Sequence, residues 1–136
     1  MNRRSFFLRV FGGATIAAFV VACKKNNSSA PTPSGTSNVN FTIDITQPAY
    51  SALQNNGGYV YANSIIIAKS NSGAFLALYD VCTHAGCTIQ FNGNQFPCPC
   101  HGSLFDTNGN VVTGPASIPV KKYNTSLSGN LLRIFS

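Results

Sequence analysis

The chain has 136 residues, which is enough for one domain and an N-terminal extension. Only 9% of the residues are charged and none is Glu, so the polar surface must come mainly from Asn, Ser, Thr and Gly, which suits an exported all-β domain. The net charge of +6 belongs mostly to the first 25 residues, because from Ser28 onward four basic residues face three acidic ones. No basic patch remains, and we therefore expect no nucleic-acid partner.

Residues 1–23 have the organisation of an export signal. A basic start is followed by an apolar run, residues 10–22, and by Cys23. The run has 13 residues, which is too short for the roughly 20 of a membrane-spanning helix but suits a signal-peptide core. The start, NRRSFF at residues 2–7, resembles a twin-arginine signal. An ordinary secretory signal with two arginines is the alternative.

The end of this region, Val20-Val21-Ala22-Cys23, resembles a bacterial lipoprotein box. We expect Cys23 to be lipidated and to tether the protein to a membrane surface, with a free cysteine or an uncleaved anchor as alternatives. Residues 24–39 are rich in Ser, Asn, Pro and Gly and are predicted to be a flexible linker. The folded domain is then residues 40–136.

Several short segments of this domain have the composition of β-strands. Residues 41–45 alternate apolar and polar side chains, as in a half-buried strand. Three further β-rich runs follow, separated by Asn, Ser and Gly: residues 59–61, 65–68 and 75–79. No segment longer than ten residues keeps a helical apolar period, so the pattern predicts an all-β domain.

Three turn signals predict how these strands pair. Asn92-Gly93 and Asn108-Gly109 are typical of type I′ hairpins, in which both central residues have positive φ. Residues 128–130 predict a turn that pairs residues 120–127 with residues 131–135.

Two short boxes contain four of the five cysteines and both histidines. They are CTHAGC at residues 82–87 and CPCHGS at residues 98–103. Both are expected on loops, and residues 88–91 with the Asn92-Gly93 turn would form a hairpin that brings them side by side. Thiolate and imidazole together favour zinc, copper or iron–sulfur chemistry.

The residue types alone leave other chemistries open. Four cysteines of an exported domain can form two disulfides, in three possible pairings. A zinc site with two Cys and two His ligands and a Cys–His nucleophile are further alternatives. The disulfide alternative leaves the histidines unexplained, and the nucleophile alternative needs only one reactive cysteine.

The sequences CTHAGC and CPCHGS resemble the two boxes of Rieske [2Fe–2S] proteins, in the branch found in cytochrome bc-type quinol oxidases. The resemblance continues in weaker form from about Gly57 to the C-terminus. It implies an antiparallel β-sandwich with a cluster-binding subdomain formed by two loops and a hairpin. Gly114-Pro115-Ala116 resembles the proline-containing loop that covers the cluster in this family.

The resemblance implies a role for each residue of the boxes. Cys82 and Cys98 would bind one iron of a [2Fe–2S] cluster, and His84 and His101 would bind the other. Two imidazoles in place of thiolates raise the reduction potential to about −150 to +300 mV, from about −400 mV in plant-type clusters.

Three further positions are interpreted in the same way. Cys87 and Cys100 would form a disulfide that joins the loops, and Ser103 would donate a hydrogen bond to a bridging sulfide. Phe105 stands where many high-potential members have a Tyr that donates to a ligand sulfur. We therefore expect a lower potential than in those members.

These features predict an electron-transfer protein or an oxidoreductase subunit rather than a complete enzyme. The leading hypothesis is a membrane-tethered carrier that faces the periplasm and exchanges single electrons with a cytochrome b or c, with quinol as a candidate substrate. One alternative is the small Rieske subunit of another oxidoreductase, such as arsenite oxidase. A structural lipoprotein with two disulfides and no iron is another.

Overall fold

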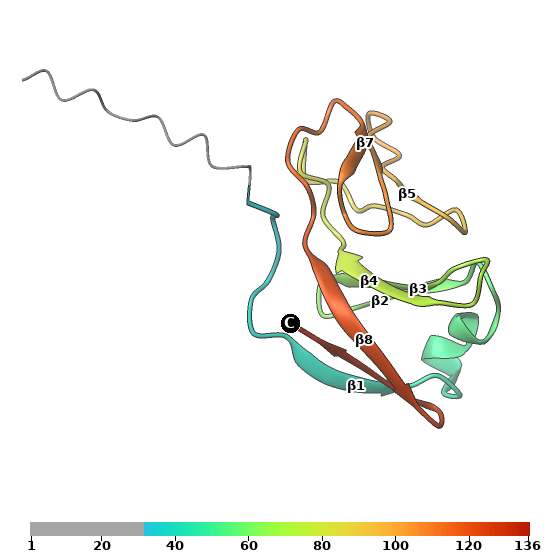
Figure 1. Ribbon diagram of the computed structural model, residues 1–136. Coiled ribbons are helices and arrows are strands. Elements are labelled where there is room, and N and C mark those ends of the chain that lie inside the picture. The colour runs from blue at the N-terminus through green and yellow to red at the C-terminus, as the bar shows by residue number, and fades with distance from the viewer. Residues whose placement is uncertain (1–31) are drawn as a thin grey trace, which may run out of the picture.

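Antiparallel strands make up nearly all the regular structure of residues 32–136, the part of the chain that this computed structural model describes (Figure 1). The predicted export signal, Cys23 and the first part of the linker lie outside the described residues. The elements in chain order are β1 Asn40–Asp44, the 3-10 helix η1 Pro48–Gln54, β2 Tyr59–Ala62, β3 Ile65–Lys69, β4 Phe75–Tyr79, β5 Phe96–Pro97, β6 Leu104–Phe105, β7 Val111–Thr113, β8 Lys122–Ser128 and β9 Leu131–Phe135.

These strands form two antiparallel sheets. The larger has six strands in the order β1-β9-β8-β4-β3-β2, and the smaller has three in the order β5-β6-β7. The larger sheet curls so that β1 and β8 form one layer and β2, β3 and β4 form the next, with the smaller sheet beyond them (Figure 1). The prediction of an all-β antiparallel fold is confirmed.

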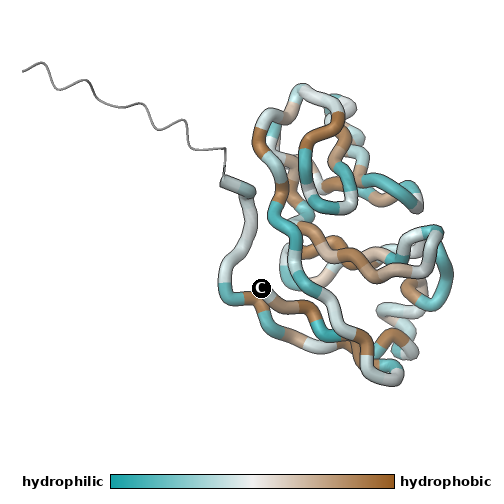
Figure 2. The backbone as a smooth tube through the Cα atoms, in the orientation of Figure 1, coloured by the Kyte–Doolittle hydropathy of each residue, from teal (hydrophilic) through white to brown (hydrophobic). Residues whose placement is uncertain are grey.

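Strands β3 and β4 are buried on both faces, which explains their continuous apolar sequences. Ile65 and Ile67 point into a core within the curled sheet, together with Leu132 and Ile134. Ile66 lies in a second core on the opposite face of β3. A strand covered on both faces needs apolar side chains at successive positions rather than alternating ones, and the hydropathy of the chain reflects this in the middle layer (Figure 2).

The second core joins the curled sheet to the smaller sheet. Its buried members come from β3, β4, the smaller sheet and the segments between them: Ile66, Ala68, Leu76, Leu78, Cys82, Ile89, Phe91, Phe96, Cys98, Phe105, Ala116 and Val120. Two cysteines of the boxes belong to this core. The fold therefore places one side of the candidate site in an apolar interior.

The predicted type I′ turns are wrong at both Asn-Gly pairs. Strands β6 and β7 form a hairpin around Asn108-Gly109, whereas the chain turns back at Asn92-Gly93 without a strand at residues 88–91, which are joined to residues 95–97 by loop hydrogen bonds. At both turns only the glycines have positive φ, 102° at Gly93 and 82° at Gly109. The two-residue loop between β2 and β3 is Asn63-Ser64, with φ values of 53° and 61°, the pattern that a type I′ turn requires. The sequence did not reveal it because Ser64 occupies the position where Gly is the usual signal.

The short helix η1 was not predicted from the sequence. It has Pro48 in its first turn, buries Leu53 and packs against β2 and β3. Seven residues of a 3-10 helix are too few to produce a helical apolar period. No helix within residues 32–136 has the length and apolar character needed to cross a membrane.

The structure also shortens the linker expected over residues 24–39. Ser34 forms an isolated parallel bridge with Val120, and the Val39 amide donates to Ser136 Oγ at 3.0 Å. Backbone hydrogen bonds of this kind need no apolar side chains, so the composition of the segment does not reveal them. From Ser34 the chain belongs to the folded body.

The turn at Gly109 gives a test of the hairpin geometry. A Cβ at Gly109 would overlap with the Val120 carbonyl oxygen, whereas a Cβ at Gly73, with a similar positive φ of 89°, would meet nothing within 4 Å. We expect Gly73→Ala to cost about 1 kcal/mol of unfolding free energy from backbone strain alone. Gly109→Ala should cost roughly 2–3 kcal/mol because strain and overlap act together. Urea unfolding measures both, and equal losses would contradict this packing.

Candidate metal centre

The first box, residues 82–87, folds into a compact loop after β4. The Cys82 amide donates to the Cys87 carbonyl at 2.7 Å, and the Gly86 amide donates back to the Cys82 carbonyl at 3.0 Å. Gly86 has φ 78°, a conformation that glycine adopts without strain. These bonds fix the loop tip, where Thr83, His84 and Ala85 lie.

The second box, residues 98–103, has the same hydrogen-bond pattern. The Cys98 amide donates to the Ser103 carbonyl at 2.7 Å, and the Gly102 amide donates to the Cys98 carbonyl at 3.1 Å. Gly102 has φ 79°. The two boxes are therefore structural equivalents, in which Cys82 corresponds to Cys98.

The equivalence of the boxes does not extend to the histidines. Counted from the first cysteine of each box, His84 is the third residue and His101 is the fourth. The sixth position is Cys87 in one box and Ser103 in the other. Two similar backbone loops thus present different side chains, and each box contributes one cysteine and one histidine to the site.

The thiols of Cys82 and Cys98 are free and lie almost completely inside the second core, with 2% and 3% of the residues exposed. The pKa of the Cys98 thiol is raised, mainly by burial and further by the neighbouring Cys82 thiol. The backbone N–H groups of Cys100 and His101 lower this pKa, but their effect is smaller. The two thiols are thus close together. A buried thiol pair of this kind gives up its protons when a metal cation takes their place.

The imidazoles of His84 and His101 form a second pair, on the outer side of the boxes. Both residues are exposed, and their ring centroids are 4.8 Å apart with an angle of 86° between the rings. No three His, Cys, Asp or Glu side chains within residues 32–136 gather as ligands of one metal ion. The donors are arranged as a buried sulfur pair and an exposed nitrogen pair.

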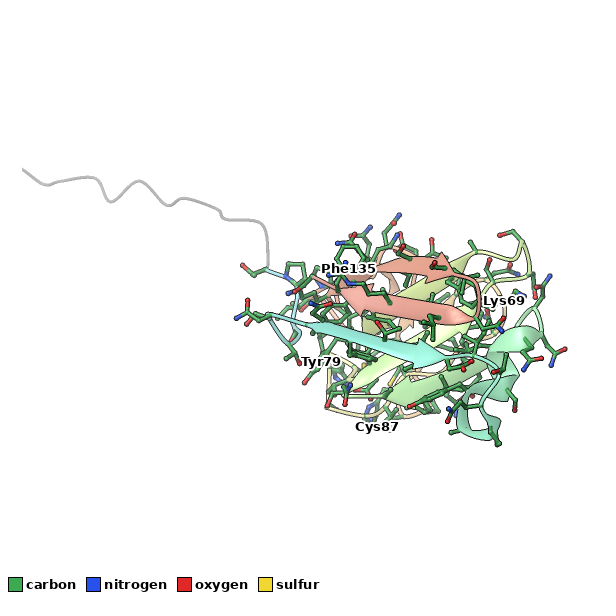
Figure 3. The ribbon with its side chains drawn as sticks, turned by 90° about the horizontal axis from the view of Figure 1, so that it is seen from below. Lys69, Tyr79, Cys87 and Phe135 are labelled. Atoms are coloured by element: carbon green, nitrogen blue, oxygen red, sulfur yellow. A yellow bond between two sulfur atoms is a disulfide. The ribbon has the colours of Figure 1, made fainter. Side chains whose placement is uncertain are left out.

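A disulfide between Cys87 and Cys100 joins the two boxes. Their Cα atoms are 6.4 Å apart and 13 positions separate them in the chain. Cys87 lies on the side of the molecule where β4 ends at Tyr79, away from Lys69 (Figure 3). The predicted disulfide is present, and the alternative with two disulfides is wrong because Cys82 and Cys98 are unpaired.

Residues 114–119 run along both boxes and are bonded to each. The Ala116 amide donates to the buried Ser103 Oγ at 2.9 Å, and Thr83 Oγ1 donates to the Ile118 carbonyl. Gly114, Pro115 and Ala116 therefore lie where the resemblance placed them, next to the second box. The role of Thr83 was not predicted, because nothing in its spacing distinguishes it from an ordinary loop residue.

The stretches of chain that contain the boxes have almost no charged side chains. Residues 81–105 and 107–120 contain no Asp, Glu, Lys or Arg. Asp106, which lies between these two stretches, accepts hydrogen bonds from the Asn108 and Asn110 amides of its own turn. Val112 and Ile118 expose apolar surface on this side, with 52% and 39% of the residues accessible.

Comparison with known proteins identifies a family and several relatives. Residues 47–124 match the family model of the Rieske [2Fe–2S] domain. The cytochrome b6-f complex iron–sulfur subunit of Trichodesmium erythraeum is 33% identical over 148 aligned positions, which cover 97% of this chain and 83% of that protein. The cytochrome b6-f complex iron–sulfur subunit 1 of Synechocystis is 44% identical over 59 positions, which cover 42% of this chain but 33% of that protein.

The fold leads to the same family. The cyanobacterial plasma membrane Rieske protein PetC3 from Synechocystis superposes with a TM-score of 0.53 and 29% identity, over 74% of this chain and 100% of that one. A protein from the complex of oxygenase and ferredoxin in carbazole 1,9a-dioxygenase matches with a TM-score of 0.54 and 20% identity, a likeness of fold alone. The match over residues 47–124 and the similarity along nearly the whole chain show that this chain belongs to the Rieske [2Fe–2S] domain family.

Proposed function

We propose that the protein carries single electrons through a [2Fe–2S] cluster bound by Cys82, His84, Cys98 and His101. The observation that carries this proposal is the pairing of donors, with two buried thiols on one side of the boxes and two exposed imidazoles on the other. Two separate pairs suit a group with two metals and two protein ligands on each. A single zinc ion with four ligands would instead need all four donors at one point.

The cysteines and the histidines of the site have different roles in binding the cluster. Cys82 and Cys98 would hold one iron as thiolates, and His84 and His101 would hold the other as imidazoles. The cluster, when bound, accepts and donates one electron at a time. Two thiolates balance the charge of two ferric ions and two sulfides, so the apolar core around the thiols encloses no net charge in the oxidised state.

The exposed imidazoles give the electron its route to a partner. His84 and His101 are the candidate ligands that reach the surface, and the stretches of chain that carry them, residues 81–105 and 107–120, contain no charged side chain apart from the histidines themselves. Steering by long-range electrostatics is weak on such a surface. The partner therefore recognises this side through apolar contacts and hydrogen bonds.

The partner we propose is a quinol-oxidising cytochrome bc-type complex. Relatives named as iron–sulfur subunits of the cytochrome b6-f complex support it. The twin-arginine-like start and the lipoprotein-like box at Cys23 support a location on the periplasmic side, with a lipid tether to the membrane surface. The protein acts as a subunit or partner and not as a complete enzyme.

Removal of the imidazoles tests the ligand set. We expect the purified full chain to contain about two irons and, when reduced, to give an electron paramagnetic resonance signal of the mixed sulfur–nitrogen type. His84→Ala and His101→Ala should each abolish this signal and lower the iron content, because the iron bound by the imidazoles loses one of only two protein ligands.

The matched control is Gln90→Ala, an exposed side chain between the two boxes, which should keep the full signal. Retention of the cluster after loss of both histidines would refute the ligand assignment. Purification of the tagged chain from membranes tests the partner separately. Recovery with a cytochrome b supports the bc-type complex, whereas recovery with a molybdenum enzyme would replace it.

Substitution of Phe105 tests the tuning of the centre. Phe105 is fully buried in the same core as Cys82 and Cys98, and a Tyr there would add a hydroxyl that can donate to a ligand sulfur. A hydrogen bond worth about 1 kcal/mol more to the reduced state raises a one-electron potential by roughly 40 mV. Redox titration should show this rise in Phe105→Tyr and none in Phe75→Tyr, which adds the same hydroxyl far from the boxes.

Loss of the disulfide tests how the boxes are held together. The bridge joins cysteines 13 positions apart in the chain, and for a loop of this size chain entropy predicts a contribution of about 3 kcal/mol. The Cys87→Ala/Cys100→Ala variant should unfold at a lower urea concentration and lose its visible absorbance faster than the wild type. Wild-type protein treated with a reductant should behave in the same way. An unchanged unfolding midpoint would mean that hydrogen bonds alone hold the boxes.

A further inference from the structure

Residues 34–36, which we call the strap, are hydrogen-bonded to the segment that enters β8. The Ser34 amide donates to the Pro119 carbonyl at 3.0 Å, and the Lys121 amide donates to the Ser34 carbonyl at 2.8 Å. In Figure 1 the first described residues run beside the chain that leads from β7 into β8. The strap thus adds a short parallel partner to residues 119–121.

Two side chains of β8 and its approach hold the strap at a second point. Lys121 Nζ and Tyr123 Oη both donate to the Thr36 carbonyl, each at 3.0 Å. Tyr123 is almost completely buried in the core of the curled sheet, so its hydroxyl is a fixed donor. The strap is therefore bound by backbone and by side-chain hydrogen bonds.

The position of Gly35 shows how closely the strap lies on the domain. A Cβ at Gly35 would overlap with Lys121 Cβ and would lie 3.0 Å from Tyr123 Oη and 3.2 Å from Tyr79 Cβ. The requirement for glycine is steric, because the crowding atoms belong to the domain rather than to the strap itself. Any larger side chain must lift the strap away.

The segment under the strap is the one that touches both boxes. Pro119, which accepts the bond from Ser34, directly follows Ile118, whose carbonyl accepts from Thr83 of the first box. Three positions before Pro119, the Ala116 amide donates to Ser103 Oγ of the second box at 2.9 Å. The strap and the two boxes are thus bonded to the same short stretch of chain.

We propose that the strap is a positioning element for the redox centre. It holds residues 116–119 in place so that the Ala116 amide keeps one lone pair of the Ser103 oxygen occupied and orients its hydroxyl toward the cluster. The expected effect on the reduction potential rests on the proposed function. The mechanical link between the strap and the Ser103 hydrogen bond stands on the contacts of this chain alone.

The link also connects the N-terminal tether to the centre. In the sequence the strap lies between Cys23, the expected lipid site, and the first strand, β1. A force applied through a lipid anchor at Cys23 would therefore act on the strap before it acts on any strand of the sheet. Release of the strap would loosen residues 116–119 and free the Ser103 hydroxyl to rotate. A donor lost from the cluster's surroundings disfavours the reduced, more negative state, and the midpoint potential then falls.

Hydrogen exchange in the full-length, cluster-loaded protein tests the mechanical link. Gly35→Ala should lift the strap, and the exchange rates of the Lys121 and Ala116 amides should each rise roughly tenfold, as the loss of one or two ordinary hydrogen bonds predicts. Ser37→Ala, at an exposed position in the same segment, is the matched control and should leave both rates unchanged. Redox titration of the same samples should show a lower midpoint potential in Gly35→Ala alone.

A second variant releases the strap without added volume. Lys121→Met/Tyr123→Phe removes both donors to the Thr36 carbonyl and should shift the Ala116 exchange rate and the potential in the same directions. Faster exchange at Lys121 with unchanged exchange at Ala116 and an unchanged potential would overturn the proposal, because the strap would then be only an N-terminal extension. Absence of a cluster from the wild type would refute the proposed function, while the exchange at Ala116 would still decide the strap.

Discussion

The burial of two unpaired thiols in an apolar core is the constraint on which the rest of this structure depends. Cys82 and Cys98 have 2% and 3% of their surface exposed, and a thiolate in such a place is costly without a cation beside it. The core that encloses them needs apolar side chains on one face of β3 and β4, and the core within the curled sheet needs them on the other face. The middle layer formed by β3 and β4 therefore provides one wall of the core in which the two thiols lie.

The outer side of the site has the opposite character. The imidazoles of His84 and His101 are exposed, 4.8 Å apart, on loops fixed by glycine turns and by a disulfide. The same boxes therefore separate a shielded sulfur side from an accessible nitrogen side. Such a division suits a carrier, since the shielded side sets the electronic properties and the accessible side meets the partner.

Residues 114–121 unite parts of the chain that are distant in sequence. They connect the smaller sheet to β8 and bond to the first box through Thr83 and to the second through Ser103. They also receive the N-terminal strap. A segment with bonds on both sides transmits a displacement more effectively than a free loop, and this is the basis of the positioning role that we propose for the strap.

The chemistry of the site was predictable from the sequence, because it depends on residue types at short spacing. The boxes at residues 82–87 and 98–103 each contain a cysteine, a histidine and a glycine, and their resemblance to one family predicted both the family and the disulfide that the structure contains. The four metal ligands stay a prediction of the same resemblance. The strands followed equally well, since apolar alternation and apolar runs are local patterns. Turn types were less secure, as Asn63-Ser64 shows, because several residue pairs can adopt positive φ.

Only the tertiary structure decided which residues distant in sequence support the boxes. Thr83 reaches Ile118, Ala116 reaches Ser103, and residues 34–36 lie along residues 119–121. These contacts use backbone carbonyls and amides, which every residue possesses, and small polar side chains that are common in loops. Local motifs therefore predict which residues could bind a metal, whereas the hydrogen bonds that hold those residues in place arise only when the folded sheets bring those segments together.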